Sequence, residues 1–197
     1  MVKWGAESTE FRAAAVLIGG SAGAVAVLGE ILPALPAKLN VPVIVVVHLP
    51  AGRPSALSEL FSRRCALAVR EPTDKQPVEP GIWFAPADYH LLIEQDRSFA
   101  LSIDEPVKFS RPSIDVLFES AASAYGAELL GIVLTGANDD AALGACAIRA
   151  RGGMLAVQDP SCAEAAAMPR AAIALAAPQL IGTIAELTSA VISASGG

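Results

Sequence analysis

The sequence is poor in several residue types, and each shortage excludes a class of protein. The three cysteines, Cys65, Cys146 and Cys162, are odd in number and widely spaced, so they predict neither a disulfide framework nor a zinc site and fit a reducing, cytoplasmic compartment. Charged residues make up 17% of the chain, with 14 basic and 20 acidic residues. Nucleic-acid binding requires a clustered basic surface, so this composition argues against it. The local pair Arg63-Arg64 predicts a solvated helix face, with an acidic partner as the alternative.

Hydrophobic runs long enough to span a membrane are also missing. The charge-free stretch 13–29 is shorter than the roughly 20 residues that a bilayer requires, and it contains several glycines. Acidic residues, Glu7 and Glu10, precede it where a signal peptide would carry basic ones. We therefore expect no membrane insertion. What the chain does have is apolar residues, 53% of 197, which suffice for a core on both faces of a sheet.

Apolar strand-like runs alternate with segments of helical character, which predicts the fold class. Residues 41–47, VPVIVVV, form a β-branched run with no polar break, as expected for a parallel strand covered on both faces. Ser113 is expected to cap a helix that Gly126 ends. The alternation predicts an α/β fold with a doubly wound, mostly parallel sheet and helices on both faces. The further expected strands are 13–18, 129–135 and 154–157, and the further expected helices are 23–32, 54–64, 139–150 and 184–192.

The middle of the chain departs from this alternation. Short apolar runs at 81–85, 89–94 and 98–103 are divided by turn-like segments, which predicts an inserted antiparallel meander or hairpin. This insertion does not make a domain. We therefore expect an N-terminal tail of residues 1–12, a single α/β domain over residues 13–193 and a C-terminal tail of residues 194–197.

A serine in a glycine-rich turn is the first candidate for chemistry. Ser21 lies in the turn from Gly19 to Gly23, between the first strand and the first helix. Such a turn would lift the Ser21 hydroxyl above the edge of the sheet, where a histidine can reach it and backbone amides can stabilise an oxyanion. The alternatives are a plain strand-to-helix turn and a phosphate-binding loop. Against a dinucleotide site, Ser21 and Ala24 occupy the second and third glycine positions of its fingerprint.

Two further strand ends carry the residues that a nucleophilic serine needs. His48 ends the second strand, and Asp139 and Asp140 follow the strand that ends at Thr135. Imidazole can accept the serine proton, and a carboxylate fixes the tautomer of the ring and stabilises the imidazolium. The structural alternatives are that His48 only caps a strand and that the aspartates serve the N-terminus of the following helix. The other histidine, His90, lies in the middle segment beside apolar residues, so we favour His48.

A series of motifs gives the chain a specific resemblance. They are Ile18 to Gly23, His48-Leu49-Pro50, Ala85-Pro86 with His90-Leu91, Arg111 to Phe118 and Leu134 to Asp140, extended by Met168 to Ala172. In this order they resemble the catalytic domain of chemotaxis protein-glutamate methylesterases, the CheB family. The resemblance implies a serine hydrolase that removes methyl groups from glutamate methyl esters of chemoreceptors and releases methanol. It also implies deamidation of particular receptor glutamines.

By position, the resemblance implies that Ser21 is the nucleophile, His48 the general base and Asp140 the orienting acid. This chain order differs from the Ser, Asp, His order of ordinary α/β-hydrolases. We expect backbone amides near Ala22 and Ala137 to hold the oxyanion. The implied partner is the methylated cytoplasmic domain of a chemoreceptor. We expect no cofactor and no metal, because the chemistry requires neither.

Several positions depart from the pattern of the family. Where the family has a threonine and two glycines after the nucleophile, this chain has Ala22, Gly23 and Ala24, while Asn138 and Ala141 replace glycines on either side of the acid. Because alanine disfavours positive φ and asparagine tolerates it, we expect reshaped loops. A catalytically weakened CheB-like interaction domain, or an esterase for another substrate, is therefore the alternative. The receiver domain typical of the family is not expected here, which leaves a stand-alone esterase or a piece of a larger protein.

Overall fold

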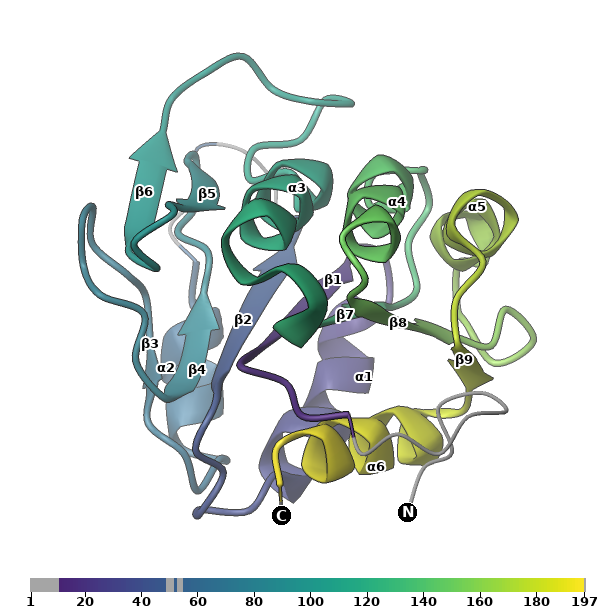
Figure 1. The fold of residues 1–197 in the computed structure, drawn as a ribbon, viewed down its shortest axis with the longest axis horizontal. Coiled ribbons are helices and arrows are strands. Elements are labelled where there is room, and N and C mark those ends of the chain that lie inside the picture. The colour runs from purple at the N-terminus through teal and green to yellow at the C-terminus, as the bar shows by residue number, and fades with distance from the viewer. Residues whose placement is uncertain (1–10, 49–51, 53–54, 197) are drawn as a thin grey trace.

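The computed structural model describes residues 11–48, 52 and 55–196, and its centre is a seven-stranded parallel sheet (Figure 1). The strand order is β3-β4-β2-β1-β7-β8-β9. A separate antiparallel hairpin holds β5 (His90–Ile93) and β6 (Phe99–Ser102). The large sheet consists of β1 (Ala15–Gly20), β2 (Pro42–Val47), β3 (Val69–Arg70), β4 (Gly81–Phe84), β7 (Leu129–Val133), β8 (Met154–Gln158) and β9 (Leu180–Gly182). The predicted fold class, a parallel sheet with an inserted hairpin, is confirmed.

Helices cover both faces of the sheet (Figure 1). One face carries α1 (Ala24–Ile31), α2 (Leu57–Ser62) and α6 (Ile184–Ala194). The other carries α3 (Ile114–Tyr125), α4 (Ala142–Ala150) and α5 (Ala167–Ala176), with the hairpin packed beside α3. Short 3-10 turns, η1 (Leu32–Ala34) and η2 (Gly126–Glu128), follow α1 and α3.

The central strands divide their side chains between two cores. In β1, Leu17 packs under α3 and α4, whereas Val16 and Ile18 pack under α1 and α6. Every residue of β1, β2 and β7 is buried, so these strands have no polar face. This explains why their sequences contain no polar break, as expected for parallel strands buried on both sides.

Part of the middle-segment prediction is wrong. Residues 81–84 do not belong to an antiparallel meander, because β4 pairs in parallel with β2 and β3 and is completely buried. Strands β3 and β9 and helix α5 were not predicted. Four expected features lie wholly or partly outside the described residues: residues 1–10 of the N-terminal tail, Leu49-Pro50 of the histidine motif, Pro54 at the start of the second helix, and Gly197 of the C-terminal tail.

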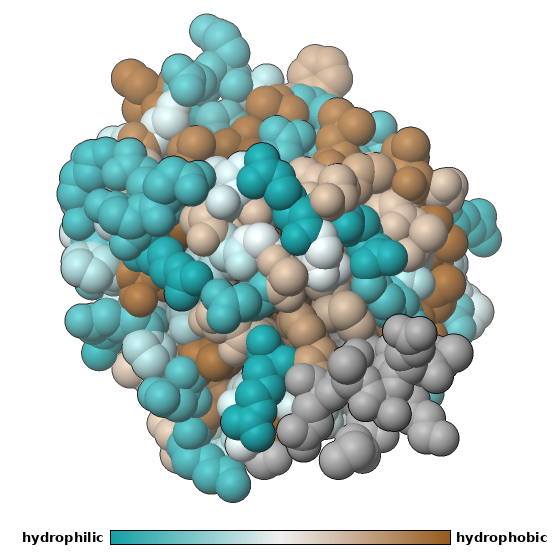
Figure 2. Space-filling view, viewed as in Figure 1, coloured by the Kyte–Doolittle hydropathy of each residue, from teal (hydrophilic) through white to brown (hydrophobic). Residues whose placement is uncertain are grey.

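Exposed apolar side chains mark part of the surface in Figure 2, where brown areas lie along the upper and right-hand margins. Ile103 and Phe109, in the loop between β6 and α3, are largely exposed, and so are Leu143 of α4 and Leu175 of α5. The longest described helix, α3, has 12 residues, and no described helix could cross a membrane.

Candidate active site

The ends of three adjacent strands bring the predicted site together. At the end of β2, the N–H of His48 donates to the carbonyl of Gly20 at 3.2 Å, so the β1–β2 ladder reaches His48. On the other side, the N–H of Ser21 donates to the carbonyl of Thr135 at 2.9 Å. Ser21 therefore lies at the end of the central strand, flanked by the end of β2 and by the loop that leads from β7 to Asp140.

The turn that carries Ser21 is fixed by its backbone. Gly23 has φ 79°, a left-handed conformation that favours glycine, and it leads directly into α1. The buried hydroxyl of Thr135 donates to the carbonyl of Ala22 at 2.9 Å and accepts from the N–H of Ala165 at 2.8 Å. The Ser21 hydroxyl forms no hydrogen bond with any described residue. Thr135 thus anchors the turn and leaves the hydroxyl of Ser21 unengaged.

His48 and Asp140 are in direct contact. The Nε2 atom of His48 lies 2.7 Å from Oδ2 of Asp140, with the two side chains 10% and 0% exposed. The carboxylate accepts this hydrogen bond, so Nε2 carries the proton and Nδ1 is the nitrogen available as a base. In the serine-protease template, the aspartate binds Nδ1 instead. The His48 ring is therefore oriented toward its aspartate in the opposite sense here.

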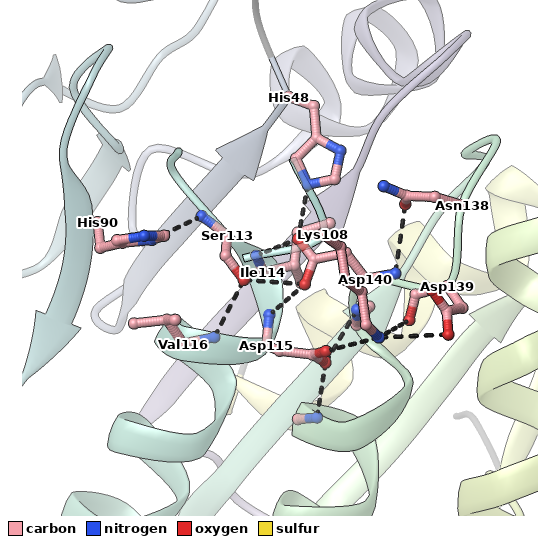
Figure 3. A network of polar contacts seen from close by, with 12 residues as sticks. His48, His90, Lys108, Ser113, Ile114, Asp115, Val116, Asn138, Asp139 and Asp140 are labelled. Carbon is pink, nitrogen blue, oxygen red and sulfur yellow. Dashed lines mark hydrogen bonds and ion pairs between the residues drawn. The ribbon is translucent and has the colours of Figure 1, made fainter. Parts of the chain in front are cut away.

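Asp140 reaches its position by binding the N-terminus of α3 (Figure 3). Its carboxylate accepts from the N–H of Ile114 at 2.8 Å, the N–H of Asp115 at 3.1 Å and the hydroxyl of Ser113 at 2.9 Å. Burial acts to raise the pKa of Asp140, but the hydrogen bonds from His48 and from the helix amides outweigh it and hold the pKa below its usual value. Asp140 is therefore a fixed carboxylate that orients the imidazole.

A second buried carboxylate, Asp115, makes the reciprocal contact from α3 to the start of α4. Oδ1 of Asp115, in α3, accepts from the N–H groups of Ala141 at 2.9 Å and Gly144 at 2.8 Å, at the start of α4. Its other oxygen lies 3.1 Å from Nζ of Lys108. Burial and the neighbouring charge of Asp140 raise the pKa of Asp115, against the hydrogen bonds from Gly144 and Lys108. Asp115 of α3 therefore accepts hydrogen bonds from backbone N–H groups at the N-terminus of α4. Asp140, which precedes α4, accepts them at the N-terminus of α3.

His90 and Asp139, the two residues that the sequence analysis did not favour, take no part in the contact between His48 and Asp140. His90 is buried, its Nδ1 accepts from the N–H of Ser113 at 3.2 Å, and its Nε2 lies 3.1 Å from the carbonyl of Glu105. Asp139 is exposed and forms an ion pair with Lys108 at 3.4 Å. His90 therefore supports the start of α3, and Asp139 helps to hold the Lys108 side chain.

Two backbone N–H groups near Ser21 are unengaged. Those of Ala22 and Ala137, in the turns after β1 and β7, donate to no acceptor among the described residues. Of the substituted glycine positions, Ala141 keeps φ 123°, which favours glycine, so backbone strain lies next to Asp140. Asn138 does not adopt a positive φ.

Three supporting residues were not predicted to have a role. Asp115 and Thr135 fall inside the quoted motifs, and Lys108 lies just before one of them. The signal for Asp115 is weak but present, because an acidic residue in the first turn of a helix with an otherwise apolar face indicates a buried partner. The Thr135 hydroxyl binds backbone groups, which leave no signature in a sequence. Lys108 contacts the carboxylates of Asp115 and Asp139, but the contact with Asp139 joins positions 31 residues apart, and no periodicity marks it.

The fold and the site define a doubly wound α/β protein with a histidine–aspartate pair beside a serine turn, an arrangement suited to acyl transfer. Comparison with known proteins makes this specific. The chain belongs to the CheB methylesterase family, whose family model matches residues 16–191.

Individual relatives agree with this family. A putative protein-glutamate methylesterase/protein-glutamine glutaminase of Leptospira interrogans is 44% identical over 160 residues, which cover 81% of this chain and 83% of that protein. A protein-glutamate methylesterase/protein-glutamine glutaminase of Symbiobacterium thermophilum is 35% identical and covers 92% of this chain, but only 50% of its own length. The crystal structure of the Thermotoga maritima CheB methylesterase catalytic domain matches with a TM-score of 0.86 and 27% identity, over 91% of this chain and 97% of that one.

Proposed function

We propose that this protein is a protein-glutamate methylesterase, a serine hydrolase that removes the methyl group from glutamate methyl esters of a chemoreceptor cytoplasmic domain. The observation that carries the proposal is the 2.7 Å hydrogen bond between His48 and Asp140 at the sheet edge where Ser21 ends the central strand. Membership of the CheB methylesterase family and the names of the relatives support the reaction and the substrate class.

In the proposed mechanism, Oγ of Ser21 attacks the ester carbonyl while Nδ1 of His48 takes the serine proton. Asp140 stabilises the imidazolium through Nε2. The unengaged N–H groups of Ala22 and Ala137 stabilise the oxyanion. His48 then protonates the departing methoxide, which leaves as methanol, and water hydrolyses the glutamyl ester of Ser21 by the same steps.

Two features next to the site suit a protein substrate. Lys108 donates to the carbonyl of Asp139, beside the site, and the next residue in the chain, Phe109, is fully exposed. Leu143, three residues after Asp140, is also exposed, in the first turn of α4. Exposed apolar side chains at the rim of a site favour contact with another protein. The relatives' names also include glutaminase, which needs the same acyl transfer with ammonia as the leaving group.

The test is methanol release from a methylated chemoreceptor cytoplasmic domain by the wild type and by Ser21→Ala. We expect the variant to lose activity by about 10³-fold or more, because the nucleophile of an acyl-transfer site is removed. Ser189→Ala is the matched control, because this exposed serine lies in α6, on the other face of the sheet.

The outcomes of this test distinguish an active methylesterase from a weakened homologue and from an esterase for another substrate. Loss of release in folded Ser21→Ala, with Ser189→Ala unchanged, would support both the activity and the nucleophile. Undiminished release by Ser21→Ala would overturn Ser21 as nucleophile. No release by folded wild type would favour the weakened homologue or a different ester.

A further inference from the structure

Asn138 is held in a fixed orientation beside the histidine–aspartate pair. It lies in the loop between β7 and α4, and its Oδ1 accepts the N–H of Asp140 at 3.2 Å. A carboxamide carries its oxygen and its nitrogen on opposite sides, so a bound oxygen also fixes the direction of the NH2 group. In Figure 3 the amide nitrogen of Asn138 is the end of the side chain nearer to the His48 imidazole.

The NH2 group of Asn138 is an unused donor. It has no acceptor among the described residues, and the side chain is half-buried. The N–H of the preceding residue, Ala137, likewise has no acceptor in the part of the chain that the structure describes. One short loop segment thus presents a backbone donor and a side-chain donor next to the acid of the site. Donors that are oriented before the substrate binds lose little entropy when they are used.

We propose that Asn138 donates a hydrogen bond from Nδ2 to the oxyanion of the tetrahedral intermediate. The inference rests on the proposed function, because it requires acyl transfer at Ser21. When Oγ of Ser21 bonds to the ester carbon, the electron pair of the carbonyl moves onto its oxygen and the serine proton goes to Nδ1 of His48. Asn138 stabilises the negative oxygen without giving up its own proton. The CheB resemblance implies glycine at this position, which has no such donor.

The experiment compares three variants, Asn138→Ser, Asn138→Asp and Asn138→Gly. Serine and aspartate keep a side-chain oxygen that can accept the N–H of Asp140, but both lack the NH2 group. Glycine removes both functions. The chain's other asparagine, Asn40, is exposed just before β2, so Asn40→Ser is the matched control.

The readout is kcat and KM for methanol release from the methylated receptor domain, and for hydrolysis of p-nitrophenyl acetate. We expect all three Asn138 variants to lower kcat by about 10- to 100-fold on both substrates, with KM changed much less, because the lost interaction forms only as the oxyanion develops. Melting temperatures should stay close to that of the wild type for Asn138→Ser and Asn138→Asp, because the turn oxygen is retained.

The other outcomes overturn the inference. Because a serine hydroxyl can also donate, the side-chain donor has no role if Asn138→Ser and Asn138→Gly both keep the wild-type kcat. A loss confined to Asn138→Asp would come from the added charge, and a loss confined to Asn138→Gly would come from the turn. A wild type that hydrolyses p-nitrophenyl acetate but releases no methanol overturns the proposed substrate, and the Asn138 series then decides the donor question on the acetate ester. Inactivity on both substrates overturns both proposals.

Discussion

A single buried carboxylate, Asp140, connects the catalytic histidine of the proposed mechanism to the scaffold. It accepts hydrogen bonds from His48, from Ser113 and from the backbone N–H groups of Ile114 and Asp115. An asparagine in its place would turn an NH2 group toward donors, so that at least one buried hydrogen bond would be lost. The cost of a lost hydrogen bond to a charged group is about 1.5–3 kcal/mol.

The pKa of Asp140 gives this cost a pH dependence. Because its pKa is lower in the folded protein than in the unfolded chain, ionised Asp140 stabilises the fold above the unfolded-chain value of about 3.9. That contribution is lost as the pH falls through the lower, folded-state pKa. We expect Asp140→Asn to lower the free energy of unfolding by about 2 kcal/mol or more at pH 7, and by clearly less at pH 3.

Urea unfolding at the two pH values measures this difference. Asp139→Asn is the control, because this neighbouring carboxylate is exposed and its ion pair with Lys108 is worth less than about 1 kcal/mol. The wild type and Asp140→Asn could instead differ in free energy of unfolding by the same amount at pH 7 and pH 3. That result would contradict a stabilising role for the ionised carboxylate, because it would mean that the charge of Asp140 does not affect stability.

At the scale of the elements, the site depends on how closely α3 and α4 approach. A Cβ atom on Gly144 of α4 would lie 2.4 Å from Cβ of Phe118 and 3.1 Å from the backbone of Asp115, both in α3. The same contact region holds the hydrogen bond between the N–H of Gly144 and Asp115. The first turns of the two helices, which position Asp140 and Asp115, therefore depend on a residue without a side chain.

We expect Gly144→Ala to destabilise the fold by about 2 kcal/mol, because the helices must separate or distort, and overpacking of this kind costs about 1–3 kcal/mol. Activity should fall with it, since the amides that bind Asp140 move. Gly29→Ala in α1 is the matched control: its Cβ would meet only the flexible end of Arg64. Because alanine has a higher helix propensity than glycine, Gly29→Ala should stabilise the fold by about 0.5–1 kcal/mol. Thermal unfolding of both variants checks these two expectations. Equal shifts of the melting temperature in the same direction would refute the packing argument.

The elements differ in how well the sequence predicted them, for physical reasons. The strands β2 and β7 could be predicted because burial on both faces leaves an unbroken apolar run. The two-residue strand β3 has no periodicity to detect. Helix α5 contains Pro169, a residue that normally argues against a helix interior. Within the candidate site, Ser21, His48 and Asp140 could be proposed from the sequence because motifs mark them, and the structure brings His48 and Asp140 into contact. The hydrogen bonds that Asp115 accepts from the N–H groups of Ala141 and Gly144 join positions 26 and 29 residues apart and use backbone donors, so no local pattern shows them.

On the scale of the whole molecule, the site lies where the connections of the sheet change direction. From β1 the chain moves to β2 and β4 on one side, and it later returns to β7, β8 and β9 on the other. Loops that leave adjacent strands in opposite directions create a crevice at the carboxyl ends, which is where ligands bind in open α/β sheets. That general rule was predictable from the alternation of elements. The order of the strands was not, because a short buried segment such as β4 reads equally well as part of a hairpin.

The same central strand links the two halves of the core, so we expect the domain to unfold as one unit. Leu17 packs beneath α3 and α4, and Ile18 packs beneath α1 and α6, although they are neighbours in β1. Leu17→Ala and Ile18→Ala should each cost about 2–5 kcal/mol, since both remove a fully buried side chain. In amide hydrogen exchange, each variant should lower the protection of β1, β2 and β7 together and by the same free energy. Loss of protection confined to the helices on the substituted side would show instead that the two layers unfold independently and that the sheet does not couple them.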